Sequence, residues 1–121
     1  MRIEYQYHTH KIIAPGDDNR VYGERIKAGW ILKVLTCFLH MPDSKINAVA
    51  EINIDQGSRE LEIRARARDA AKQGMSTLNP FYVGEYQRIV GHAPDSEEGD
   101  EICLTVIGEL IPLKKWRKGK V

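Results

Sequence analysis

The longest apolar run of the chain, residues 29–40, most constrains what it can fold into. It mixes β-branched, aromatic and leucine side chains, a composition typical of strands. It begins at Gly29 and ends before Met41-Pro42-Asp43, a turn whose proline cannot donate to a ladder. Because both faces of this run are largely apolar, we expect it in the middle of a sheet, packed inside a sandwich.

Shorter runs with a strand pattern lie on both sides of this central run. Apolar and polar side chains alternate along most of them, as expected for strands with one buried face. We expect the second run to form a hairpin with the central run and the last run to pair with it. The predicted strands cover residues 2–10, 20–26, 29–40, 46–55, 59–67, 81–90 and 101–113.

One of these runs is ambiguous. Residues 59–73 are rich in alanine, and Ser58 could begin a helix there. A helix would place Leu61 and Ile63 on different sides, whereas a strand places them on one face. We therefore favour a strand to Ala67, followed by a short helical turn over residues 70–73.

These strands and the turns between them predict an all-β fold, an antiparallel β-sandwich with at most one short helix. We favour a jelly roll over an immunoglobulin arrangement, because the segments around residues 41–45 and 68–80 are longer than tight hairpins. With 121 residues the chain can bury about two thirds of its unfolded surface. We expect one domain over residues 1–113 and a basic tail over residues 114–121.

Charge and cysteine content narrow the function classes. The net charge is only +1, so we expect neither nucleic-acid nor membrane binding. The first residues alternate without the apolar core of a signal peptide, which predicts a soluble protein made in a cytosol. For Cys37 and Cys103 we favour buried core thiols, and a disulfide between adjacent strands is the alternative.

The pattern does not point to an enzyme. His8 and His10 share one strand face and could bind a metal with Glu4 or His40, but such pairs are usually surface residues. The cupin pattern that would continue from them is absent. Acidic pairs such as Asp17-Asp18 stand in turns, where they serve the backbone. We predict no catalytic residue, no metal site and no cofactor.

The sharpest charge feature is the C-terminal tail, with five cations around one tryptophan. We predict that it binds a partner; the alternatives are a solvated terminus, phosphate contacts, or docking on the acidic loop 95–101 of a neighbouring subunit. If residues 59–67 form a strand, Arg64, Arg66 and Arg68 form a second basic stripe, and a charged edge that discourages aggregation is the alternative. The tail residues concerned are Lys114, Lys115, Trp116, Arg117, Lys118 and Lys120.

Three segments resemble small jelly-roll accessory and decoration proteins of tailed-phage virions. They are residues 29–32, which open the long strand, residues 81–89, and residues 101–108 after the acidic turn. The resemblance spans residues 2–112. It implies a structural component of the virion, a head decoration, head fibre or tail accessory protein, assembled in the host cytoplasm. It further implies a symmetric homo-oligomer, with a trimer favoured, and binding to other virion proteins or to a host glycan.

The alternative function is a carbohydrate-binding module. Exposed aromatic side chains such as Trp30, Tyr82 and Tyr86 could form a platform on which sugars stack. Aromatic residues grouped on one sheet face would favour this function, and burial of these three would exclude it.

Overall fold

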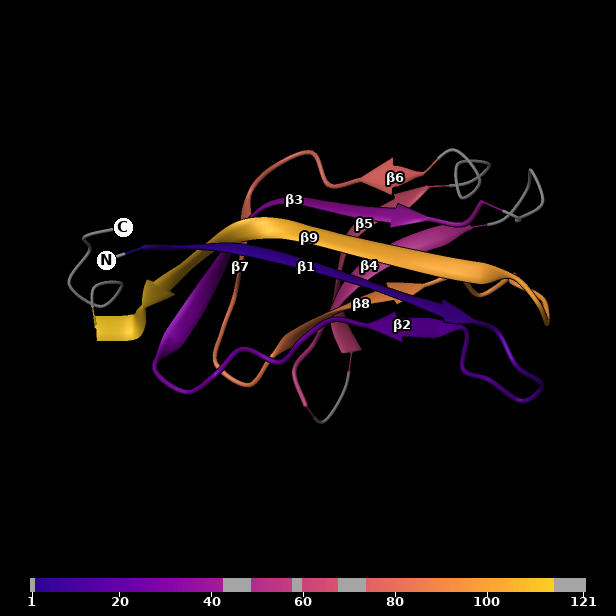
Figure 1. Cartoon of the computed structure of the whole chain (residues 1–121), viewed down its shortest axis with the longest axis horizontal. Helices are drawn as coiled ribbons and strands as arrows, with labels where there is room; N and C mark the ends of the chain where they lie inside the picture. The colour runs from indigo at the N-terminus through magenta and orange to yellow at the C-terminus, as the bar shows by residue number, and fades with distance from the viewer. Residues whose placement is uncertain (1, 43–48, 58–59, 68–73, 115–121) are drawn as a thin grey trace.

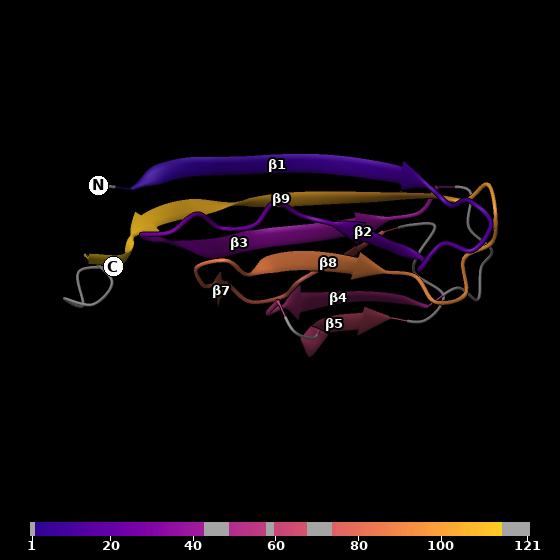
Figure 2. The ribbon, with the colours of Figure 1, turned by 90° about the horizontal axis from the view of Figure 1, so that it is seen from below.

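Two antiparallel sheets stack face to face in the computed structural model, which describes residues 2–42, 49–57, 60–67 and 74–114 (Figures 1 and 2). No helix in these ranges is long and apolar enough to cross a lipid bilayer. The strands are β1 (Ile3–Ile12), β2 (Arg20–Tyr22), β3 (Trp30–His40), β4 (Ala50–Asp55), β5 (Glu60–Ala67), β6 (Met75–Ser76), β7 (Phe81–Val83), β8 (Arg88–His92) and β9 (Glu101–Pro112).

The strand order is that of a jelly roll. One sheet runs β1-β9-β3-β6, with β7 also paired to β3, and the other runs β2-β8-β4-β5. β6 and β7 both lie against β3 and therefore act as two halves of one strand. If β6 and β7 count as one strand, β1 pairs with β9, β2 with β8, β3 with the combined strand, and β4 with β5. This is the double Greek key of the jelly roll, so the predicted fold class is confirmed.

The central position of the long apolar strand is also confirmed. β3 pairs with β9 from Trp30↔Pro112 to His40↔Cys103 on one side, and with β6 and β7 on the other. Its inward side chains from Leu32 to Leu39 are fully buried between the sheets. The predicted pairing with the last strand holds as well. The inner face of that strand carries every second residue of this run, Ile102, Leu104 and Val106.

The single strand predicted over residues 81–90 is in fact two strands, β7 and β8. The chain turns at residues 84–87, so β7 joins the sheet of β3 and β8 joins the other sheet. Tyr86 adopts a φ of 64°, which is rare for a bulky residue. Its N–H donates to the Ile26 carbonyl, and the Gln87 side chain accepts from Gly84 N–H. These tertiary contacts fix the turn inside an apparently continuous run.

The predicted hairpin between residues 20–26 and the central run is wrong. β2 is short and pairs with β8, in the sheet opposite β3. Beyond Tyr22 the chain still follows β8, because Gly23 and Ile26 donate backbone hydrogen bonds to the Ile89 and Gln87 carbonyls. The strand predicted to Ala67 is confirmed as β5. The helical turn predicted over residues 70–73 lies outside the described residues.

The two cysteines differ in burial. Cys37 lies in the core, and burial raises the pKa of its thiol to about 12. Cys103 lies on the outer face of β9 and is half-buried. Neither is in a disulfide, and the core prediction holds for Cys37 alone.

Candidate interaction surface

The outer face of the β1-β9-β3 sheet lies opposite the face that packs on the second sheet (Figure 2). Alternation along the strands directs every second side chain to it. Cross-strand rows follow from the register, for example Gln6 beside Ile107 and Thr36, or Glu4 beside Glu109 and Lys33. We call this surface the outer face.

A β-bulge makes the centre of the outer face apolar. Val34 pairs with Gly108 and Thr36 with Ile107, which leaves Leu35 without an opposite residue. Leu35 is 41% exposed, as is Ile107. The strands approach closely here, because a Cβ at position 108 would lie 2.2 Å from the Lys33 carbonyl oxygen. The chain therefore needs glycine at the bulge that brings Leu35 to the surface.

The bulge also borders a shallow hollow of about 480 Å³. Apolar side chains meet polar ones around it, an arrangement that is usual where proteins bind each other. The hollow is lined by Glu4, Tyr5, Gln6, Leu35, Ile107, Gly108 and Glu109.

The two histidines that could have bound a metal lie on the outer face as predicted, with ring centroids 6.5 Å apart. His8 Nδ1 lies 2.8 Å from the Thr105 hydroxyl, and His10 Nδ1 lies 3.2 Å from the Glu101 carboxylate. His40 is on β3, separated from His10 by Cys103 of β9. In the part of the chain that the structure describes, no three His, Cys, Asp or Glu side chains form a group that could hold a metal ion.

A second hollow, of about 330 Å³, opens at the end of the sandwich where β1 begins. The Tyr5 hydroxyl donates to Glu24 at 3.0 Å; burial and this bond raise the pKa of Tyr5 well above its usual range. Tyr82 and Tyr86 are exposed but do not line this hollow. Its lining residues are Ile3, Tyr5, Glu24, Arg25, Ile26, Lys27, Trp30 and Leu110.

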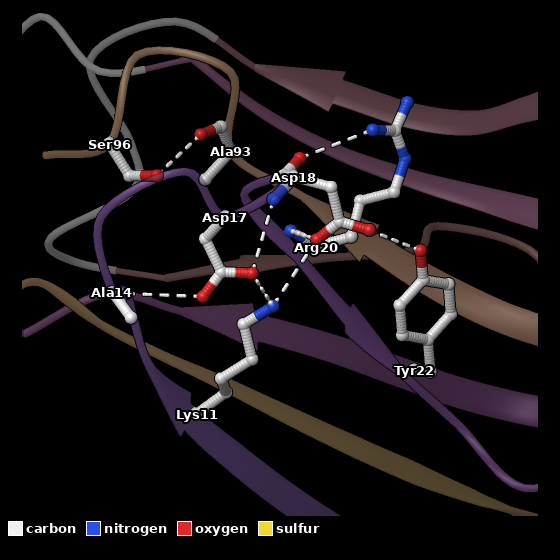
Figure 3. Close-up of polar contacts among 8 residues, drawn as sticks. All are labelled: Lys11, Ala14, Asp17, Asp18, Arg20, Tyr22, Ala93 and Ser96. Atoms are coloured by element: carbon white, nitrogen blue, oxygen red, sulfur yellow. Dashed lines mark hydrogen bonds and ion pairs between the residues drawn. The ribbon is translucent and has the colours of Figure 1, made fainter. Parts of the chain in front are cut away.

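Acidic residues near β2 form a polar network with structural partners (Figure 3). The Lys11 ammonium contacts both Asp17 and Asp18, and the Tyr22 hydroxyl donates to Asp18. Burial alone would raise the pKa of Asp18, but the hydrogen bonds from Tyr22 and Lys11 outweigh it and lower the pKa to about 2. Asp17 also accepts from the N–H of Ala14, so the predicted turn role of this pair is confirmed.

The network continues across the second sheet. The Arg88 guanidinium lies 4.1 Å from the centroid of the Tyr22 ring, and its Nε donates to Asp55 at 2.8 Å. Arg25 contacts the same carboxylate at 3.1 Å. Burial would raise the pKa of Asp55, but the Gly57 N–H and Arg88 hold it below its usual value. Strands β2, β8 and β4 are thus joined by side chains as well as by their ladders.

Of the predicted partner-binding tail, the structure describes only Lys114. Lys114 is exposed, whereas Lys115, Trp116, Arg117, Lys118 and Lys120 lie outside the described residues. In the acidic loop, Asp95 accepts from Val49 N–H and Asp100 from Glu97 N–H. Of the second basic stripe, Arg64 lies 5.3 Å from the Phe81 ring centroid. The Arg66 side chain and Arg68 are not among the described groups.

No protein-family model matches the chain, and no curated protein matches it. Among solved structures it is similar to a chain in the acid-stable capsid structure of Helicobacter pylori bacteriophage KHP30. The two chains share their fold. They are 12% identical, with a TM-score of 0.59 over 92% of this chain and 95% of the other.

This likeness agrees with the sequence resemblance to phage virion proteins at the level of fold. It covers nearly all of both chains, so the two have similar lengths and no large part of either lacks a counterpart. At this sequence identity it carries no site residue from one chain to the other. The candidate surfaces therefore depend on the geometry of this chain alone.

Proposed function

We propose that this chain is a non-enzymatic structural component of a phage virion that acts through protein–protein contacts. The observation that carries the proposal is the fold match to a capsid chain over 92% of this sequence. Because that chain is part of a capsid structure, we favour head decoration over a head fibre or tail accessory role. Assembly then takes place in the host cytoplasm.

The outer face supports this function. Leu35 and Ile107 are each 41% exposed beside a hollow rimmed by Glu4 and Glu109. An apolar centre with a polar rim suits a contact with another protein, since burial of the centre supplies free energy and the rim supplies specificity. We propose that neighbouring virion proteins bind this face, and that the basic tail adds a second contact.

Particle composition tests the proposal. Particles released from cells that carry this gene are banded on a density gradient, and their proteins are quantified by mass spectrometry. We expect the chain in the particle band, at a constant ratio to the main shell protein across the fractions. A chain that is abundant in the lysate but absent from the particles would overturn the proposal.

Carbohydrate binding is the second candidate, favoured by the hollow that Tyr5, Trp30 and Glu24 line. An indole ring beside a carboxylate is an arrangement that can bind a sugar ring. A glycan array read with the wild type and with Trp30→Ala tests it. Binding that Trp30→Ala abolishes would establish this function, and an empty array would remove it.

A further inference from the structure

β1 is a free edge strand, and it lacks the usual protection of one. It is the outermost strand of its sheet and pairs with β9 through consecutive residues from Ile3 to Ile12, with no register shift (Figure 1). It contains neither proline nor glycine. Soluble proteins normally shorten, bend or charge such edges, because unpaired N–H and C=O groups invite another strand. Its one lysine, Lys11, lies near the end and pairs with Asp17 and Asp18.

The other sheet edges are protected. β2 has three residues, and the edge opposite β1 consists of the short pieces β6 and β7. β5 is longer, but its register against β4 shifts twice. Among the described strands, β1 is thus the long and regular edge on which a partner strand could lie.

The hydrogen bonds of Ile13 show which groups of β1 are available. Its N–H donates to Asp100 and its C=O accepts from Gly99, so its backbone groups face the β9 side. Successive residues of an antiparallel strand direct both groups to opposite sides. The backbone N–H and C=O groups of the odd-numbered residues of β1 therefore face β9. The residues whose N–H and C=O groups face away from β9 are Glu4, Gln6, His8, His10 and Ile12.

We propose that β1 pairs antiparallel with β1 of a second copy, about a two-fold axis at Tyr7. This axis stands perpendicular to the sheet and places Glu4 opposite His10 of the second copy, and Gln6 opposite its His8. The four resulting hydrogen-bonded pairs supply about eight N–H···O bonds in this geometry. Tyr7 meets its own copy in a pair without hydrogen bonds, where side chains approach most closely.

Side-chain complementarity selects this register over its neighbours. An axis at His8 would place His8 opposite itself and the Glu4 carboxylate opposite Ile12. An axis at Gln6 would place His10 opposite Arg2, two groups that can both be cationic. The axis at Tyr7 instead sets a carboxylate and an amide against imidazoles, with no like charges facing each other.

This inference deepens the proposed function and rests on it, since it says how two copies of a virion component would bind each other. The two sheets would join into one, β3-β9-β1 continuing into β1-β9-β3 of the second copy. Because main-chain hydrogen bonds hold the contact, salt should weaken it little, unlike a contact made by the basic tail. The pairing gives an even number of copies, which differs from the trimer that the sequence resemblance implies.

Light scattering after size exclusion, at low and high salt, tests the inference with the full chain. We expect twice the 13.8 kDa mass in both buffers. Gln6→Pro removes an outward N–H and places a ring on the edge without touching the β9 ladder, so the dissociation constant should rise about tenfold or more. Gln6→Thr keeps the N–H and should stay dimeric. A monomer or a trimer for the wild type, or a dimer that Gln6→Pro leaves intact, would overturn the inference.

A cross-link covers the case in which Gln6→Pro does not fold. In a Cys103→Ser background, Tyr7→Cys places two thiols opposite each other, about 4.5 Å apart between Cα atoms, which a disulfide can bridge. Thr9→Cys is the matched control, because this register places residue 9 opposite Tyr5 of the second copy and not opposite residue 9. Mild oxidation should give a covalent dimer of Tyr7→Cys only. Equal cross-linking of both, or none, contradicts the register. The particle analysis separates this failure from failure of the virion function.

Discussion

The centres of the two outer faces of the sandwich differ in how far their apolar side chains are exposed. On the β2-β8-β4-β5 sheet, Val90 is fully buried although its cross-strand partners Tyr22 and Asn53 place it on the outside. Nearby, Arg88 stacks on Tyr22 and binds Asp55, and His92 lies 3.0 Å from Glu51. On the β1-β9-β3 sheet, Leu35 and Ile107 at the centre remain exposed, whereas Ile31 and Ile111 at one end are buried.

We therefore expect the outer face of the second sheet to contribute to stability and that of the first sheet to contribute to binding. Across the described parts of β2, β8 and β4, polar side chains on this face pair within the chain itself, so this area has less to offer a partner. The outer face of the first sheet keeps an apolar centre that the described residues leave exposed and that a partner could cover. Substitutions on the two faces should therefore affect different measurements, and the following predictions test that division.

The largest loss of stability should come from replacing Gly108, which lies opposite Val34 next to the bulge. Gly108→Ala forces a Cβ against the Lys33 carbonyl and must shift β9 away from β3, at a cost of about 3 kcal/mol or more. Gly16→Ala is the control. That site has a φ of 77° but open space around it, so it should lose only about 1 kcal/mol. Urea unfolding measures both; equal losses would mean that the close approach is not needed.

Breaking the polar network of the second sheet should have the next largest effect. Arg88→Ala leaves the mostly buried Asp55 carboxylate with fewer partners and removes the ring contact with Tyr22, so about 2 kcal/mol of stability should be lost. Arg2→Ala breaks an exposed pair with Glu109 and should change stability by less than about 0.5 kcal/mol. Similar losses in the two variants would remove the contrast between the faces.

Acid should weaken the polar network of Asp17, Asp18 and Asp55. The pKa values of Asp17, Asp18 and Asp55 lie below the ordinary value of 3.8 in the folded chain. Their contribution is therefore complete above that value and is lost as the pH falls towards about 2, where Asp18 takes up its proton. Asp18→Asn should remove about 1 kcal/mol of this pH dependence, since the side chain is partly exposed. A slope that is unchanged in the variant between pH 5 and pH 2 would contradict the assignment.

The long strands could be predicted from the sequence because their patterns reflect local burial. The alternation of residues 101–113 puts Ile107 on the face opposite Ile102 and Leu104, and the structure has them on opposite faces. The bulge at Leu35 could not be predicted, since it depends on which residues of β9 lie opposite β3. Nor could the turn at residues 84–87, where Tyr86 takes a left-handed conformation that its side chain disfavours.

The candidate site was predicted less well than the fold. The sequence directed attention to the charged tail, because five cations in a short stretch stand out, whereas exposed Leu and Ile residues do not. The free edge of β1 depends on strand order, which follows from pairing between the two ends of the chain. His8 and His10 were predicted to share a face and do so, because that needs only the alternation of one strand.

The smallest change in stability should come from the outer face, together with a large change in binding. Leu35→Glu alters a side chain that is already 41% exposed, so unfolding should shift by less than about 0.5 kcal/mol. If neighbouring virion proteins cover Leu35, the buried carboxylate should sharply reduce the amount of the chain in purified particles. Leu78→Glu is the matched control, because Leu78 is 93% exposed and does not line the hollow beside Leu35. Normal incorporation of Leu35→Glu would show that partners bind elsewhere, and reduced incorporation of both variants would show a general effect of charge.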